Sequence, residues 1–243
     1  MKNDSSMVKL VTSTLIAITK AGDYLLTVEN GLSSACDSGL ARIKMKFGDS
    51  GSGDSLMKST EERYRSDLSR SFRYSSVVLL YTIFESRSRL FIEDYQARHG
   101  AIKKSKDGTY VTKLRNMMEN HSRQIIVSRS KIWDRLEDLN VVRNCIAHAG
   151  GLLRHCDRSD DVRRIATYNN FLMIDEDGYI QLDFEYSFQL YEWIYAYFTL
   201  TFSAAGYSID MPEYTEREKI ITPDDERIDL EAVMNSYYSK MGI

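Results

Sequence analysis

The sequence predicts an all-α protein, a helical bundle into which one small β-hairpin is inserted. Two observations indicate this class. The 243 residues include only two prolines, and proline is the residue that most strongly interrupts helices. From Thr60 to Arg98 there is no glycine or proline, and the apolar residues recur at the spacing of one helix face. Because 43% of the residues are hydrophobic, a chain of this length is able to bury a sizeable core.

The first part of the chain, residues 1–55, is predicted to be an N-terminal helical segment that ends in a flexible linker. An amphipathic helix over 7–30 is indicated by apolar residues close to helical spacing: Val8, Val11, Leu15, Ile18 and Leu25. A helical or irregular piece follows over 32–47. Residues 48–55 read Gly-Asp-Ser-Gly-Ser-Gly-Asp-Ser, a low-complexity composition that is typical of linkers. We therefore place a boundary there.

The main helical domain is expected to cover residues 56–206. After the helix over 60–98, further helices are predicted over 111–129, 131–148 and 185–205. The expected buried face of the 131–148 helix is Trp133, Leu136, Leu139, Val142 and Ile146. The last helix is dense in aromatic residues, which indicates buried packing or a dimer interface.

A β-hairpin and an acidic tail complete the predicted elements. Two short apolar runs, 171–174 and 179–184, flank an Asp-Gly turn at 177–178, which is a strong hairpin signal. Residues 207–243 form an acidic C-terminal tail in which a short helix is predicted over 228–240.

Charge, cysteines and hydropathy restrict the class of protein further. A net charge of -3 argues against a protein that coats nucleic acid through bulk positive charge. Three cysteines without a CxxC pair argue against a disulfide framework. The apolar stretch Val8–Ile18 contains Lys9 and is too short to cross a bilayer. We therefore expect a cytoplasmic protein with no membrane association and no cofactor.

One short motif carries the chemistry of the chain: Arg143-Asn144-Cys145-Ile146-Ala147-His148, followed by two glycines. The guanidinium of Arg143 is a planar donor that suits phosphate oxygens. His148 carries an imidazole, the side chain that most often acts as acid or base in catalysis. Asn144 and His148 share a helix face, whereas Arg143 and His148 point about 140° apart on a regular helix. No second pair of ligands accompanies His148, so no metal site is predicted.

Arg143-Asn144 followed by His148 resembles the R-x4-6-H signature of the HEPN superfamily, small helical bundles in which Asn often follows the Arg. The resemblance covers roughly residues 60–205. It implies a metal-independent endoribonuclease in which two protomers bring their motifs together, and in which a ribose 2′-OH attacks the adjacent phosphate. It also implies catalytic roles: His148 as acid or base, Arg143 stabilising charge on the phosphate, and Asn144 orienting either the histidine or the phosphate.

Proteins of this superfamily typically serve as toxins or as effectors of antiviral defence. The resemblance therefore implies RNA as substrate, a homodimer, and an antitoxin or defence-system protein as partner. In toxins paired with a nucleotidyltransferase antitoxin, a Tyr commonly stands two residues after the His. Here that residue is Gly150, which argues against neutralisation by modification of a tyrosine.

A basic segment precedes the motif. From Arg98 to Lys131 the chain has nine basic residues against two acidic ones, a local balance of +7 in an acidic protein. We expect this segment to contact RNA phosphates through five residues: Lys103, Lys104, Lys106, Lys113 and Arg115. The alternative is an ordinary solvated helix face.

Two other functions stay open. An arginine and a histidine near a helix C-terminus also complement the helix dipole, which is a purely structural role. If the motif has only that structural role, the chain is instead a non-catalytic HEPN-like module that binds RNA or a protein partner. The third possible function, after the ribonuclease and the binding module, is a purely structural dimerisation domain.

Overall fold

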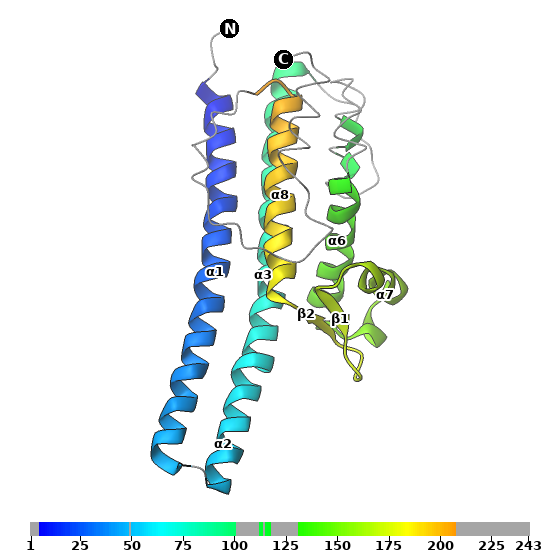
Figure 1. Ribbon diagram of the computed structural model, residues 1–243. Helices are drawn as coiled ribbons and strands as arrows, with labels where there is room; N and C mark the ends of the chain where they lie inside the picture. The colour runs from blue at the N-terminus through cyan, green and yellow to red at the C-terminus, as the bar shows by residue number, and fades with distance from the viewer. Residues whose placement is uncertain (1–4, 49, 101–111, 114, 118–130, 208–243) are drawn as a thin grey trace.

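The computed structural model describes residues 5–48, 50–100, 112–113, 115–117 and 131–207. This part of the chain is mostly helical and contains one two-stranded antiparallel sheet, which confirms the predicted all-α class with a β-hairpin (Figure 1). None of its helices is both long enough and apolar enough to cross a membrane.

The described elements form a four-helix bundle with a small appendage. In chain order they are α1 (Ser5–Phe47), α2 (Gly51–Glu61), the π-helix η1 (Glu62–Leu68), α3 (Ser69–His99), α6 (Lys131–Ala149), the 3-10 helix η2 (Leu153–His155), α7 (Ser159–Tyr168), β1 (Leu172–Ile174), β2 (Ile180–Leu182) and α8 (Phe184–Ala204). In Figure 1, α1 runs antiparallel to α3, and α6 lies on the other side of α8. Helices α1, α3, α6 and α8 pack on one another, and the hairpin and α7 lie beside the end of α6.

The N-terminal helix is longer than predicted, and most of the predicted linker is helical. Helix α1 continues to Phe47 and ends at Gly48, whose φ is +58°. The Ser50 hydroxyl then caps α2 by accepting a hydrogen bond from the Gly53 amide at 3.2 Å. A Cβ on Gly53 would lie 3.0 Å from the Gly48 carbonyl oxygen, so a larger residue there would require this tight turn to shift slightly. The prediction of a flexible linker is therefore wrong for residues 51–55, because the cap and the close packing hold them in a helix.

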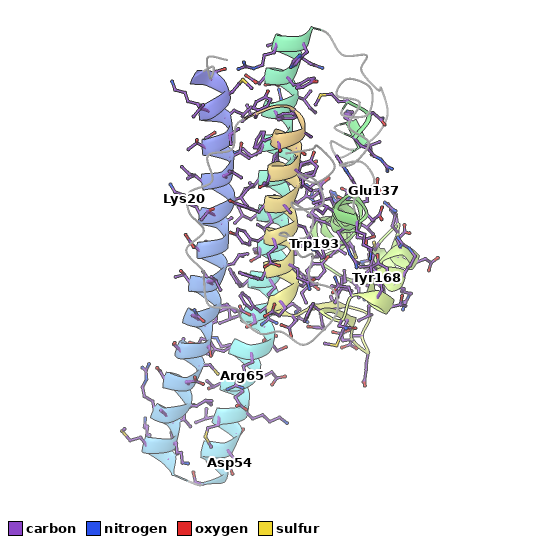
Figure 2. All side chains as sticks on the ribbon, turned by 45° about the horizontal axis from the view of Figure 1, so that its top comes forward. Lys20, Asp54, Arg65, Glu137, Tyr168 and Trp193 are labelled. Carbon is purple, nitrogen blue, oxygen red and sulfur yellow. The ribbon has the colours of Figure 1, made fainter. Side chains whose placement is uncertain are left out.

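The far half of α1 and the α2–η1 rod form a two-helix arm, residues 31–68. Of the arm's described residues only Cys36 and Gly53 are buried. Figure 2 shows Asp54 and Arg65 on this arm, far from Trp193 in the bundle. At its base, Arg73 of α3 donates to Glu29 of α1 and, at 2.8 Å, to the Leu182 carbonyl. The arm is thus an extension of the bundle that contributes little to its core.

The aromatic helix predicted over 185–205 is α8, and its aromatic residues pack inside the bundle. The Tyr197 ring lies 5.2 Å from Phe84 of α3 and 5.1 Å from Trp133 of α6, both edge-on. The predicted buried face of α6 is confirmed at all five positions: Trp133, Leu136, Leu139, Val142 and Ile146. On α3 not every apolar residue is buried, since Leu90 is 42% exposed.

The hairpin and α7 hold the end of α6. The strands pair with Leu172 opposite Leu182, as the Asp-Gly turn predicts. Helix α7 was not expected, because most of its residues are charged or polar. It buries only Val162 and Ile165, which stand at helical spacing, but a ten-residue segment with so few apolar residues is easily taken for a polar loop.

Candidate functional site

Helix α6 ends one residue after His148 because two glycines follow in left-handed conformations. Gly150 has a φ of +60° and Gly151 has a φ of +79°. Residues other than glycine rarely adopt such backbone conformations. A Cβ on Gly151 would lie 2.1 Å from the Tyr74 hydroxyl oxygen of α3. That hydroxyl donates to the Ile180 carbonyl of β2 at 2.5 Å. His148 is therefore held on the last turn of α6, where it is exposed.

Arg143 belongs to a polar cluster between α3 and α6, which we call the Tyr81 cluster: Tyr81, Glu85, Asn140, Arg143 and Asn144. The Arg143 guanidinium lies 5.1 Å from the centroid of the Tyr81 ring, and its Nη1 donates to Asn144 Oδ1 at 2.8 Å. The Tyr81 hydroxyl donates to Asn140 Oδ1 at 2.8 Å. Asn144 Nδ2 donates to the same oxygen at 3.4 Å. These contacts orient the guanidinium from both helices.

Burial raises the pKa of Tyr81, the neighbouring carboxylate of Glu85 raises it further, and Arg143 opposes the shift. The hydroxyl therefore stays a hydrogen-bond donor well above neutral pH. Arg143 is half-buried, and its Nε is buried without a hydrogen-bond partner among the described residues. Sequence reasoning missed the roles of Tyr81 and Asn140, since neither belongs to the motif.

The structure brings Arg143 and Asn144 together and leaves His148 apart. Because α6 is a regular α-helix over the whole motif, the directions of Arg143 and His148 differ by about 140°. Arg143 faces α3, whereas His148 is exposed at the helix end. The Asn144 amide hydrogen-bonds to Arg143 and Asn140 rather than to His148.

Three of the predicted RNA-binding residues, Lys103, Lys104 and Lys106, lie outside the described residues. The other two, Lys113 and Arg115, lie in short described helical pieces and are half-buried. RNA contact by these five side chains stays a prediction.

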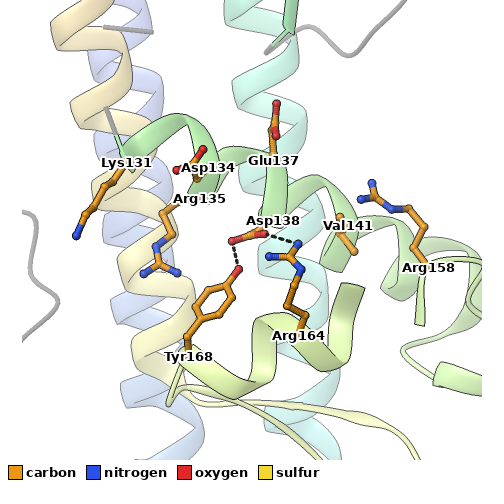
Figure 3. Close-up of a pocket in the computed structure, with 9 residues that line it drawn as sticks. All are labelled: Lys131, Asp134, Arg135, Glu137, Asp138, Val141, Arg158, Arg164 and Tyr168. Atoms are coloured by element: carbon orange, nitrogen blue, oxygen red, sulfur yellow. Dashed lines mark hydrogen bonds and ion pairs between the residues drawn. The ribbon is translucent and has the colours of Figure 1, made fainter. Parts of the chain in front are cut away.

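A second polar site lies on α6, facing α7. It is a cavity of about 420 Å³, within the size range of small-molecule pockets. We call it the α6–α7 cavity (Figure 3). Its lining is charged almost throughout: Lys131, Asp134, Arg135, Glu137, Asp138, Val141, Arg158, Arg164 and Tyr168. Sequence reasoning missed this cavity, because most of these residues resemble a solvated helix face.

Asp138 is the buried carboxylate of the α6–α7 cavity, with a relative exposure of 9%. Its Oδ2 accepts a hydrogen bond from the Tyr168 hydroxyl, and its Oδ1 lies 3.6 Å from Arg164 Nη2. Burial raises the pKa of Asp138, while Tyr168 and Arg164 act against the shift. A signal in the sequence existed: Asp138 interrupts the otherwise apolar buried face of α6.

Basic side chains surround this carboxylate. The Arg135 guanidinium lies 4.9 Å from the Tyr168 ring centroid and 5.6 Å from that of Trp193. Arg158 Nε pairs with Asp161 at 2.6 Å, and Arg164 pairs with the same carboxylate at 3.5 Å. Arg158 and Arg164 are both more than half exposed, so they form the outer edge of the cavity.

The cavity and His148 lie on one face of α6. Val141 lines the cavity, and His148 follows it by seven residues. Seven residues advance an α-helix by about 10 Å and return to within about 20° of the same direction. The histidine therefore continues the face that carries the cavity, whereas Arg143 faces α3.

No group of three or more His, Cys, Asp or Glu side chains is placed to bind a metal ion in the described part of the chain. Cys36, Cys145 and Cys156 are all free thiols. Comparisons of the chain with family models, with curated proteins and with solved structures find no match. The fold and the site thus define a helical-bundle protein with a histidine at a helix end and a charged cavity on the same helix face.

Proposed function

We propose that this protein is a metal-independent endoribonuclease of the HEPN type, active as a homodimer and serving as a toxin or an antiviral-defence effector. The observation that carries the proposal is the arrangement of the motif on α6. Arg143 is oriented by the Tyr81 cluster, and His148 is exposed at a sharply terminated helix end. These are a phosphate-binding and a proton-transferring group, but one chain points them in different directions.

A two-fold dimer resolves the divergence. In such a dimer the same surface of each protomer faces its partner, so His148 of one chain is able to meet Arg143 of the other. His148 then accepts the proton of a ribose 2′-OH, and the 2′ oxygen forms a bond to phosphorus. The bond from phosphorus to the 5′ oxygen breaks as that oxygen takes up a proton. Arg143 stabilises the charge that develops on the phosphate. The products are a 2′,3′-cyclic phosphate and a 5′-hydroxyl.

Mutation of the motif tests the activity. Purified protein should cleave mixed RNA in the presence of EDTA and leave cyclic phosphate ends. His148→Ala should reduce the rate by about 100-fold or more, the usual contribution of acid–base catalysis. Arg143→Lys should lose a similar factor, because a point charge does not reproduce bidentate phosphate contacts. His155→Ala is the matched control, since His155 is also exposed but lies outside the motif. Full activity in both motif variants, or loss of wild-type activity in EDTA, would sink the proposal.

Complementation tests the shared site. Arg143→Ala and His148→Ala proteins, each inactive alone, are unfolded together, refolded as mixed dimers and assayed. Pairing across chains leaves one intact His148–Arg143 combination in each heterodimer, so part of the activity should return. Verified heterodimers without activity, or a wild-type protein that is active as a monomer, would rule out the cross-chain site.

The second candidate function is a non-catalytic module that binds RNA or a protein partner. The observation that favours it is that Arg143 already has contacts within its own chain, to Tyr81 and Asn144. This function predicts RNA or partner binding without cleavage, and binding that His148→Ala does not change. The cleavage assay above separates the two candidates.

A further inference from the structure

Two of the three cysteines lie together at the end of α6. Cys145 belongs to the motif and is buried, with a relative exposure of 1%. Cys156 follows η2, is partly exposed and packs against the core cluster that contains Cys145. Burial raises the pKa of Cys145, and a hydrogen bond with the Cys156 thiol raises it further. The two thiols are therefore in contact, although the ten residues 146–155 separate them in the sequence.

Backbone hydrogen bonds hold the two thiols at this place. The chain turns back at Gly151, whose amide donates to the Cys145 carbonyl at 3.1 Å. The Leu153 amide donates to the Gly178 carbonyl of the hairpin turn at 2.9 Å, which anchors η2. The Cys156 amide closes η2 by donating to the Leu153 carbonyl at 3.0 Å. Cys156 therefore returns to the last turns of α6 on a fixed path.

We infer that Cys145 and Cys156 form a reversible disulfide when the protein meets hydrogen peroxide, and that this bond slows RNA cleavage by moving His148. The second part of this inference rests on the proposed ribonuclease function, whereas the disulfide itself does not. Sparse cysteines argue against a structural disulfide framework, but disulfides that form transiently in reducing compartments are typically redox-sensing.

The two thiols have different parts in the reaction because only Cys156 is accessible to solvent. Its thiolate attacks one oxygen of the peroxide, the O–O bond breaks, and the other oxygen leaves as water with the proton of the thiol. The Cys145 sulfur then attacks the sulfenic sulfur, the S–O bond breaks, and the oxygen leaves as a second water with the Cys145 proton. Two thiols are thereby oxidised to one disulfide, and one peroxide is reduced to two waters.

The contact between the thiols compensates for the weak nucleophilicity of Cys145. A thiol with a raised pKa is rarely ionised, so by itself Cys145 is a poor nucleophile. Well-oriented groups in one molecule, however, react as if present at about 10⁵–10⁸ M. An accessible thiol beside a second thiol that resolves its sulfenic acid is the usual arrangement of redox-sensing cysteines.

A disulfide at this place changes the position of His148. The S–S bond is about 2 Å long, much shorter than a contact between two free thiols. Cys145 precedes His148 by three residues, so both stand on the same turn of α6. A displacement of about 1 Å in a catalytic group is able to cost about 100-fold in rate. Drawing Cys145 towards Cys156 should therefore slow cleavage, and reduction should restore it.

Peptide mapping tests the disulfide without any assay of function. Full-length protein is treated with a small excess of hydrogen peroxide, its remaining thiols are alkylated, and it is digested with trypsin without reduction. Cleavage after Arg143, Arg154 and Arg158 places the two cysteines on separate peptides, 144–154 and 155–158. Mass spectrometry should show these two peptides linked, and dithiothreitol should separate them. Cys156 oxidised only to sulfinic or sulfonic acid, or linked to a second chain, would overturn the inference.

Cysteine variants give the matched controls. In Cys156→Ser, peroxide should leave Cys145 unmodified, because the remaining thiol is buried. Cys36→Ala should form the 144–154 to 155–158 link as readily as the wild type, since Cys36 lies in the arm. Peroxide oxidation of Cys145 in Cys156→Ser, or loss of the link in Cys36→Ala, would contradict the assigned pair.

RNA cleavage tests the regulatory part. Oxidised wild type should cleave at least about ten-fold more slowly than reduced protein, and dithiothreitol should restore the rate. Cys156→Ser should keep the same rate before and after peroxide. An equal loss of activity in Cys156→Ser, or an unchanged rate in fully linked wild type, would refute the regulation. A linked pair in a protein that cleaves no RNA would refute the ribonuclease and leave the disulfide standing.

Discussion

At the scale of single residues, Arg143 shows how a side chain with reactive potential is kept in place. Its guanidinium is held by a ring on one helix and an amide on its own helix, and the hydroxyl of that ring bonds to Asn140. Each contact is weak, of the order of 1 kcal/mol. Together they favour one rotamer of a long, flexible side chain, which under the proposed function prepares the guanidinium to meet a phosphate.

Tyr81→Phe tests this arrangement. The ring and its contact with Arg143 stay, but Asn140 Oδ1 loses its shorter hydrogen bond. The free energy of unfolding, measured by urea denaturation, should fall by about 0.5–1.5 kcal/mol. Tyr24→Phe is the control. Tyr24 is 50% exposed, so this substitution should leave the free energy of unfolding unchanged. An equal effect of the two substitutions would show that the Tyr81 hydroxyl contributes nothing specific.

At the scale of elements, the end of α6 is set by its neighbours as much as by its own glycines. Gly151 lies against Tyr74 of α3, and Tyr74 bonds to Ile180 of β2. The Ile180 amide in turn donates to the Gly151 carbonyl at 2.9 Å. Helix, hairpin and motif are therefore joined at one point, which keeps His148 at a defined position.

Tyr74→Phe tests this junction through its pH dependence. Burial raises the pKa of Tyr74 to about 12, and Arg70 opposes the shift. Since the folded-state pKa lies above the unfolded value of about 10, the stability that Tyr74 contributes is complete below pH 10. It is lost as the pH rises towards 12. At pH 8 the wild type should be about 0.5–1.5 kcal/mol more stable than the variant in urea denaturation. This advantage should shrink between pH 10 and 12, and a constant difference over that range would contradict the assignment.

At the scale of the whole molecule, the bundle and the arm differ in what they contribute to stability. The core lies among α1, α3, α6 and α8, whereas the arm buries only two of its described residues. The link between Glu29, Arg73 and the Leu182 carbonyl closes the bundle at the base of the arm. The arm is therefore expected to be dispensable for folding.

Replacing residues 31–66 with a loop of about four residues tests this division, since packed helix axes lie about 8–10 Å apart. The shortened protein should unfold cooperatively, with a melting temperature within a few degrees of the wild type. Arg73→Ala in the full chain should cost more, about 1–3 kcal/mol, because it leaves Glu29 and the Leu182 carbonyl without their donor. Loss of cooperative unfolding on shortening would show that the arm is part of the folding unit.

The sequence by itself determined the helices of the core and the hairpin. Helical and strand periodicities follow from local backbone geometry, so the buried face of α6 and the two paired strands are readable from residue spacing. The same local reasoning was wrong for residues 51–55 and did not find α7. In both places packing against other elements outweighs a weak local preference for helix.

Only the tertiary structure decided which reactive side chains meet. Tyr81 and Asn140 are 59 residues apart in sequence, and Asp138 and Tyr168 are 30 apart, yet each pair shares a hydrogen bond. Such contacts depend on how α6 is rotated about its axis within the bundle, which the spacing of residues on α6 does not specify. That rotation turns Arg143 towards α3 and Asp138 towards α7. The motif and the divergence of Arg143 and His148 were readable from the sequence, but the partners of Arg143 on α3 and the cavity on α6 exist only in the packed protein.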